Sequence, residues 1–311
     1  MLITPHKRSA VWGHTQEPPL LSGTTDNEET NMEVHEPIKR DRNLNITVIA
    51  DDSAYGRTAA QHGVQLAEVF QASLTIMANF DFHLPDKPSE PDKVFVSELQ
   101  NTVQNAKNKQ VITDYVFPET LFRYAEEHNT AMFVIGVDKT KKEGFFNVKK
   151  AIKLIRQSRF PVMTVTEKHN DTTCYKHILL PLDIERQNKE KALWAGYFSR
   201  FYGSVIHILY PKYKDEGLIK LVYDNVAFVE KLYENLEITY EKHETSPQSY
   251  LDAYALEFAP QVAAGASVIM MTRYYTLGDV LTGPRERKII GSSELPILCI
   301  NQRDDLYVLC T

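Results

Sequence analysis

Two landmarks occur twice in this sequence at nearly the same spacing, and this repeat restricts the fold more than any other feature. A β-branched apolar run that ends in acidic residues, 46–53, has the same form as the run 178–183. A run built around proline, 160–165, has the same form as 295–300. Self-similarity at a fixed offset is the signature of a duplicated structural unit. The sequence therefore predicts two copies of one fold.

Segments with strand and helix patterns alternate in the same order in both copies. Apolar residues at helical spacing follow each opening run, and short β-rich runs follow these helices at 73–80 and 205–210. Strands that alternate with helices are typical of a parallel sheet with helices on both faces and right-handed crossovers. We therefore expect two α/β domains, at residues 44–168 and 175–303.

Prolines and apolar runs suggest further boundaries. Pro118 and Pro247 suit the first position of a helix, and Ser246 is a suitable N-cap for the second of these helices. Pro260 should end or kink that helix. A fourth helix should precede each closing strand. Strands are expected at 110–116 and 236–243, and strands buried on both faces at 131–135 and 267–271.

Each closing strand lies at the end of its copy, so its edge is exposed unless another strand covers it. Two such edges in one chain can cover each other. We therefore expect the two domains to pair through their closing strands as an intramolecular pseudo-dimer. The helical faces leave a homodimer open as an alternative.

Composition and charge exclude several classes of protein. The net charge of -6 and the pI near 6.0 predict no general affinity for nucleic acid or for an anionic membrane. The three cysteines form no CxxC pair and have no metal-ligand spacing. No segment approaches the roughly 20 apolar residues that cross a bilayer, and no export signal is recognisable, so we expect a cytoplasmic protein.

The ends of the chain have no strand or helix period. Residues 1–43 contain several prolines and a polar run, which predicts an extended or disordered arm, and residues 304–311 are expected to form a C-terminal tail. The histidines of the arm, His6, His14 and His35, are interpreted as part of a solvated segment rather than as metal ligands.

These stretches resemble the universal stress protein family in its tandem-domain form. The resemblance rests on 178–183, on its partner ending in Asp51-Asp52-Ser53, on 124–136 and on the two closing runs, which together span about residues 44–303. It implies Rossmann-like, adenine nucleotide alpha hydrolase-like domains, each with a five-stranded parallel sheet that dimerises through its fifth strand. It also implies a role in stress tolerance. Its specificity comes from the order of the motifs occurring twice.

Many family members bind ATP in a glycine-rich loop after the fourth strand, where backbone amides approach the phosphates closely and a helix N-terminus adds a positive dipole. In the second copy only Gly283 of that pattern remains. The other glycine positions fall on Met270 and Arg273, and Pro284 removes an amide donor. Tyr274 and Tyr275 are expected to fill the space of a phosphate.

The first copy has a different, basic loop. Gly136 is kept, the second glycine position is Lys139, and the closing pair falls on Lys149 and Lys150. Lysine ammonium groups can hold a phosphate as point charges without glycine amides. This loop is therefore a candidate anion or nucleotide site. The alternative is a solvated helical face, because such charge runs commonly lie on the surface.

Acidic residues follow the opening strand of each copy. In an open α/β sheet, ligands bind outside the carboxyl ends of the strands, which is where Asp51, Asp52 and Asp183 are expected. The resemblance places such an aspartate near the adenine side of the nucleotide. Helix capping by Asp52 or Ser53, or a turn role for Asp51 and Asp183, is the alternative.

No enzyme motif is present: there is no GxSxG elbow, HExxH helix, Walker loop or GxGxxG turn. His207 alternates with apolar residues and is interpreted as a packed strand residue. No histidine outside the arm has a partner at a recognisable spacing, so no metal site is expected; these histidines are His62, His83, His128, His177, His207 and His243.

The sequence thus predicts a universal stress protein-like chain with degenerate ATP-binding loops that acts by binding rather than by catalysis. No cofactor is expected, and ATP is the alternative. The partner, whether a protein or a small ligand, is not specified. A nucleotide- or anion-binding sensor that uses the lysine-rich loop is the second hypothesis, and a weak ATP-hydrolysing or small-molecule enzyme is a distant third.

Overall fold

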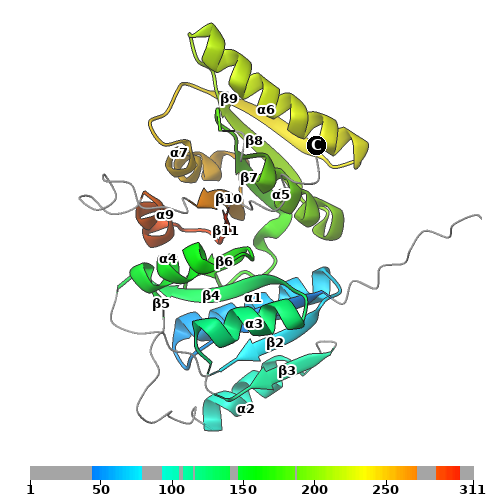
Figure 1. Cartoon of the computed structure of the whole chain (residues 1–311), viewed down its shortest axis with the longest axis vertical. Helices are drawn as coiled ribbons and strands as arrows, with labels where there is room; N and C mark the ends of the chain where they lie inside the picture. Colours follow the sequence, from blue (N-terminus) through cyan, green and yellow to red (C-terminus); the bar gives the residue numbers. More distant parts are fainter. Residues whose placement is uncertain are drawn as a thin grey trace, which may run out of the picture. The chain divides into compact units, whose positions relative to one another are not determined.

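A single sheet runs through the part of the chain that the computed structural model describes, namely residues 44–78, 93–104, 108–114, 116–140, 146–185, 188–271 and 285–301. The sheet has 11 strands in the order β3-β2-β1-β4-β6-β11-β10-β7-β8-β9, with β5 paired to β4 (Figure 1). All its pairings are parallel except that between β6 and β11.

The first half of the sequence supplies six strands and four helices within the described residues. The strands are β1 (Asn45–Ile49), β2 (Ser73–Met77), β3 (Lys109–Ile112), β4 (Thr130–Asp138), β5 (Phe146–Asn147) and β6 (Val162–Val165). The helices are α1 (Ala54–Val69), α2 (Lys93–Thr102), α3 (Pro118–Glu127) and α4 (Val148–Gln157).

The second half repeats this order. Its strands are β7 (His177–Pro181), β8 (Val205–Pro211), β9 (Tyr240–Thr245), β10 (Ala266–Met271) and β11 (Ile297–Asn301). Its described helices are η1 (Cys174–Lys176), α5 (Asn188–Tyr202), α6 (Glu216–Asn235), α7 (Leu251–Phe258), η2 (Ala259–Val262) and α9 (Glu286–Ser292). The predicted α/β fold with a mostly parallel sheet is confirmed.

Helices cover both faces of the sheet because its central strands are apolar on both faces. In β4, Met132 and Val134 belong to the core cluster that includes residues of α1 and α2, whereas Phe133 and Ile135 belong to the cluster that includes residues of α3 and α4. Successive side chains of a strand point to opposite faces, so a continuous apolar run serves both cores. All four of these side chains are fully buried.

The closing strands of the two halves lie side by side. In the antiparallel β6–β11 pair, Thr164 is opposite Ile297 and Val162 is opposite Cys299. The Thr164 hydroxyl also donates to the carbonyl of Ile297, at 3.3 Å. Each strand thereby covers an edge of the other. The division into two domains with five strands each stays a prediction.

Several predicted boundaries were correct and others were wrong. Helix α3 begins at Pro118, α7 ends before Pro260, and α4 and α9 precede the closing strands. Helix α7 does not begin at Pro247: Tyr250 is still extended, so helical geometry starts at Leu251. The Ser246 hydroxyl instead accepts a hydrogen bond from the Gln248 side chain, at 3.1 Å.

The third strands were also placed imprecisely. Strand β9 begins at Tyr240 rather than at 236, because α6 continues to Asn235 and Glu237 then turns the chain with a positive φ of 54°. Strand β3 spans Lys109–Ile112, so it begins one residue before the expected range and ends well short of 116. Among the described helices, none has the length and apolar character that crossing a bilayer needs.

A buried polar contact joins α1 to the start of the second half. The His62 ring nitrogens lie 2.6 Å from the Tyr175 hydroxyl and 2.6 Å from the carbonyl oxygen of His169. A carbonyl oxygen can only accept, so Nε2 of His62 carries the proton and Nδ1 accepts from Tyr175. His169 in turn accepts from the backbone N–H of Thr166 at Nδ1, at 3.1 Å. Burial lowers the pKa of His62 and lowers that of His169 to about 4.

We expect the free energy of unfolding to fall in acid because His169 is buried in its neutral form. The pKa of His169 in the folded chain is depressed below its ordinary value of 6.5, so the unfolded chain binds the proton first as the pH falls. The stabilisation is complete above the ordinary pKa and is lost towards about pH 4. Between about pH 7 and pH 4.5, His169 should contribute a loss of about 2–3 kcal/mol in the free energy of unfolding.

Urea unfolding at a series of pH values would measure this loss in the wild type and in His169→Asn. The asparagine side chain keeps an acceptor for the N–H of Thr166 but does not titrate. Its stability profile should therefore be flatter in acid by the stated amount and parallel to the wild type above about pH 7. If the two chains lost stability equally over the whole pH range, His169 would not be the source of the acid-dependent loss.

Candidate functional site

The carboxyl ends of β1 and β4 carry the predicted site residues of the first half. Asp51 accepts from the backbone N–H of Ser53, at 3.3 Å, and from the Ser53 hydroxyl. The Ser53 hydroxyl caps α1 by accepting from the N–H of Gly56, at 3.2 Å. Asp52 is exposed. Helix capping, one of the two alternatives for this segment, is therefore seen for Ser53, while Asp51 supports the turn before it.

Gly136 and Gly56 allow helix α1 to approach β4 closely. A Cβ atom on Gly136 would lie 2.2 Å from the carbonyl oxygen of Tyr55 and 3.0 Å from the nitrogen of Gly56. A Cβ atom on Gly56 would lie 2.3 Å from the carbonyl oxygen of Asp51. The absence of a side chain at 136 is thus explained by backbone packing, since real Cβ atoms do not approach backbone atoms so closely.

The backbone of Tyr55 lies against Gly136, and its side chain lies near Asp138 and Thr140. The side chain is 6% exposed, and burial together with the carboxylates of Glu167 and Asp138 raises its pKa to about 12. Asp138 is itself fully buried and accepts from the N–H and the hydroxyl of Thr140, at 2.6 and 2.7 Å. The strand end that the family resemblance links with a nucleotide is therefore occupied by an aromatic ring and an aspartate-centred turn.

Lys139 extends towards the second half of the chain. Its ammonium group donates to the carbonyl of Ser293 and lies 3.7 Å from a carboxylate oxygen of Glu294. Burial lowers the pKa of Lys139, although Glu294 opposes this shift. The Lys139 ammonium group is therefore already bound by residues 293–294, which precede β11.

The other two lysines of the predicted anion site lie at the start of α4. Asn147 caps this helix by accepting from the backbone N–H of Lys150, at 3.0 Å, and Lys149 is exposed. Because Asn147 takes the amide of Lys150, that donor is already satisfied within the chain. The structure therefore places Lys139 and the pair Lys149–Lys150 in different settings.

The carboxyl ends of β7 and β8 form a second polar cluster. Asp183 accepts from the Tyr213 hydroxyl, at 2.9 Å, and its backbone carbonyl accepts from the Asn225 amide, at 2.6 Å. Burial and the hydrogen bond to Asp183 raise the pKa of Tyr213 to about 12. Gly283 and the tyrosines at 274 and 275 lie outside the described residues, so this end of the predicted second site is not placed.

A buried ion pair adjoins this cluster. The ammonium group of Lys191, in α5, lies 3.2 Å from a carboxylate oxygen of Asp252, in α7, and the two side chains are 2% and 13% exposed. Burial raises the pKa of Asp252, Lys191 lowers it, and the carboxylates of Glu185 and Asp183 raise it further. Five ionisable side chains thus lie near one another at these strand ends, namely Asp183, Glu185, Lys191, Tyr213 and Asp252. Ionisable groups that shift one another's pKa at strand ends are the arrangement expected of a polar ligand site.

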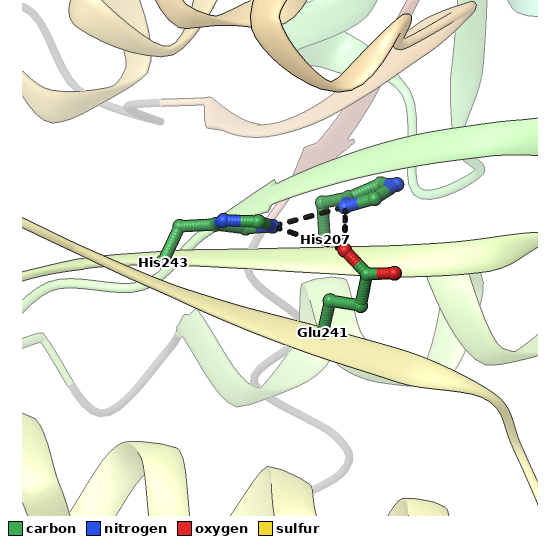
Figure 2. Close-up of side chains that lie close together, drawn as sticks. All are labelled: His207, Glu241 and His243. Carbon is green, nitrogen blue, oxygen red and sulfur yellow. Dashed lines mark hydrogen bonds and ion pairs between the residues drawn. The ribbon is translucent and has the colours of Figure 1, made fainter.

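Sequence reasoning missed a group of histidines on neighbouring strands. His177, His207 and His243 form consecutive hydrogen bonds across β7, β8 and β9, at 2.9 and 3.0 Å (Figure 2 shows the second of these). His207 is a buried strand residue, as predicted, and burial lowers its pKa to about 4. No recognisable spacing joins these histidines in the sequence, and the sheet pairs them instead. Their positions on predicted adjacent parallel strands were the available signal.

No family model and no curated protein matches this sequence. Solved structures do match. A universal stress protein from Archaeoglobus fulgidus aligns with a TM-score of 0.60 and 12% identity, over 85% of this chain and 100% of that chain. A functionally unknown protein from Pseudomonas aeruginosa aligns with a TM-score of 0.54 and 14% identity, over 86% of this chain and 96% of that chain. The chain therefore has the fold of a universal stress protein.

Proposed function

We propose that this chain is a tandem universal stress protein of the cytoplasm that acts in a stress response by binding, not by catalysis. In this proposal the first half is a scaffold whose nucleotide pocket is closed, and the ligand site lies at the strand ends of the second half. The proposal rests on the contacts that close the first-half site. The backbone of Tyr55 lies against Gly136, and the Lys139 ammonium group donates to the carbonyl of Ser293 and pairs with Glu294.

The described residues at the strand ends of the first half do not fit a phosphate group. A phosphate cradle needs glycine amides with open space in front of them, or cations directed into that space. Gly136 faces the backbone of Tyr55, Lys139 donates to the carbonyl of Ser293, and the amide of Lys150 bonds to Asn147. These contacts favour a degenerate site over the sensor that the lysine-rich loop suggests.

The second-half cluster supports a binding role there. A site that selects a polar ligand needs hydrogen-bonding groups held in fixed positions by their own partners. Tyr213 donates to the carboxylate of Asp183, Asn225 donates to the backbone carbonyl of Asp183, and Lys191 donates to Asp252. The Lys191–Asp252 pair is buried, whereas Asp183 and Tyr213 are only partly buried, so their carboxylate and hydroxyl groups suit a small polar molecule.

The proposal can be tested by titrating the full chain with labelled ATP and magnesium. We expect no saturation below about 1 mM, which corresponds to a binding free energy weaker than about -4 kcal/mol. Binding in the low micromolar range that is lost in the double variant Lys139→Ala, Lys149→Ala would support the sensor instead. Phosphate release that is lost in the same variant would support the enzyme.

A survival assay tests the binding role in the cell. In the organism that encodes this chain, deletion of the gene should lower survival under stress. The Lys139→Ala, Lys149→Ala chain should restore survival as well as the wild type does, whereas Asp183→Ala with Tyr213→Phe should not. The reverse pattern would place the function in the first half and would overturn the proposal.

A further inference from the structure

Three side chains with metal-binding atoms converge on one face of β8 and β9 (Figure 2). His207 of β8 is paired in register with Glu241 of β9. Because side chains two positions apart in a strand share a face, His243 lies on the same face as Glu241. The parallel register of two strands thus brings together two imidazoles and one carboxylate, which we call the β8–β9 triad.

The distances within the triad match those between the ligands of one small metal ion. Nδ1 of His207 lies 3.0 Å from Nε2 of His243 and 3.4 Å from a carboxylate oxygen of Glu241. The third separation, between Nε2 of His243 and that oxygen, is 3.8 Å. A tetrahedral zinc ion with bonds of about 2.0–2.1 Å holds its ligand atoms roughly 3.3 Å apart. The spacing of the three atoms is therefore compatible with all three binding one zinc ion.

We propose that the β8–β9 triad is a binding site for a zinc ion. Nδ1 of His207, Nε2 of His243 and the carboxylate of Glu241 would supply three ligands, and water would complete the tetrahedron. Neither the universal stress protein fold nor the proposed function requires such a site. Two imidazoles with one carboxylate suit zinc, whereas calcium and magnesium prefer shells made of oxygen ligands alone.

His177 holds His207 in the orientation that zinc needs. Nδ1 of His177 lies 2.9 Å from Nε2 of His207. If Nε2 of His207 carries the proton and donates to His177, Nδ1 of His207 keeps its lone pair for the metal. Metal-binding histidines commonly donate their second N–H in this way, which fixes the tautomer and the ring position.

The other residues around the triad hold His207 and His243 in place and leave one side of the triad open to solvent. The His207 side chain is 4% exposed, that of His243 is 23% exposed, and that of Glu241 is 60% exposed. The ring of Phe258, at the end of α7, packs against His243 with 5.2 Å between centroids. Because Glu241 is largely exposed, an ion can reach the triad from solvent past this side chain. In the metal-free chain a proton lies between the two imidazoles, and zinc would replace it and release it.

The proposal is tested by calorimetric titration of the full chain with zinc chloride after treatment with a chelator. We expect one zinc ion per chain at this site, with affinity lowered at least about 100-fold in His243→Ala and about 10-fold or more in Glu241→Gln. His128→Ala is the matched control, since His128 is exposed and lies outside the triad, and its affinity should be unchanged. Circular dichroism would show that each variant is folded.

Two further variants make the result unambiguous. Replacing His177 with phenylalanine should weaken binding about 10–100-fold, since it removes the partner that orients His207. Replacing His6, His14 and His35 together with alanine should leave binding unchanged. Cobalt bound at the site should show the absorption of a tetrahedral centre and lose it in His243→Ala. Absence of zinc binding, its persistence in His243→Ala, or its loss only in the triple variant would overturn the proposal.

Discussion

Replacing Asp252 with alanine should lower the free energy of unfolding by about 3–5 kcal/mol, because it leaves the Lys191 ammonium group buried without its partner. The Lys191 side chain is 2% exposed and lies 3.2 Å from the Asp252 carboxylate. Water cannot reach the Lys191 ammonium group to solvate it once Asp252 is gone. The folded state therefore loses more free energy than the hydrogen bond alone contributes. Urea denaturation of both chains would measure the difference.

Two controls separate this mechanism from a general effect of losing a carboxylate. The exposed pair Lys212–Glu244 has a similar distance of 3.1 Å, yet Glu244→Ala should cost much less stability than Asp252→Ala, since water screens the remaining charge. The double variant Lys191→Met, Asp252→Leu should recover much of the loss, because it removes both buried charges. Equal effects of Asp252→Ala and Glu244→Ala would contradict the prediction.

Tyr175→Ala should destabilise the fold by about 3–5 kcal/mol, since it empties the site of a large, fully buried ring. The ring of Tyr175 packs against Phe198 and Tyr202, with centroid distances of 5.3 and 5.9 Å. Its hydroxyl also supplies the proton that Nδ1 of His62 accepts. The residue therefore connects α1 with η1 and α5, and thermal or urea unfolding should show its loss clearly.

The phenylalanine variant isolates the hydroxyl. Tyr175→Phe keeps the ring but leaves the buried His62 nitrogen without a donor, so it should cost about 1–3 kcal/mol. Tyr223→Ala is the matched control, since that ring is 44% exposed, and its cost should stay below about 1 kcal/mol. If Tyr175→Ala were no more damaging than Tyr223→Ala, the proposed link between α1 and the second half would be wrong.

The sequence predicted the succession of strands and helices well where the signal was local. The apolar run that became β4 and the run that became β10 are buried, because burial on both faces requires apolar residues at every position. Pro118 was informative because its restricted φ suits a helix start. Pro247 was misleading, since the same restriction is also compatible with the extended segment that precedes α7.

The roles of the loop residues could not be derived from their positions in a motif. Gly136 suggested a phosphate site, but Tyr55 approaches it from a helix far earlier in the sequence. Lys139 suggested a free cation, but Ser293 and Glu294, from the other half of the chain, engage it. Such contacts depend on how the halves pack, and no local pattern encodes them.

The sequence by itself determined the alternation of strands and helices and which strands are buried, since periodicity and apolar character act within a few residues of each position. The tertiary structure alone decided which polar groups meet. His177, His207 and His243 lie on three different strands and are separated by 30 and 36 positions, so no spacing motif joins them. In the parallel register, Val205 is opposite His177 and Glu241 is opposite His207, so each following histidine lies two positions further along its strand and on the same face. Their rings meet across this offset because neighbouring strands in a sheet lie about 5 Å apart whatever their separation along the chain.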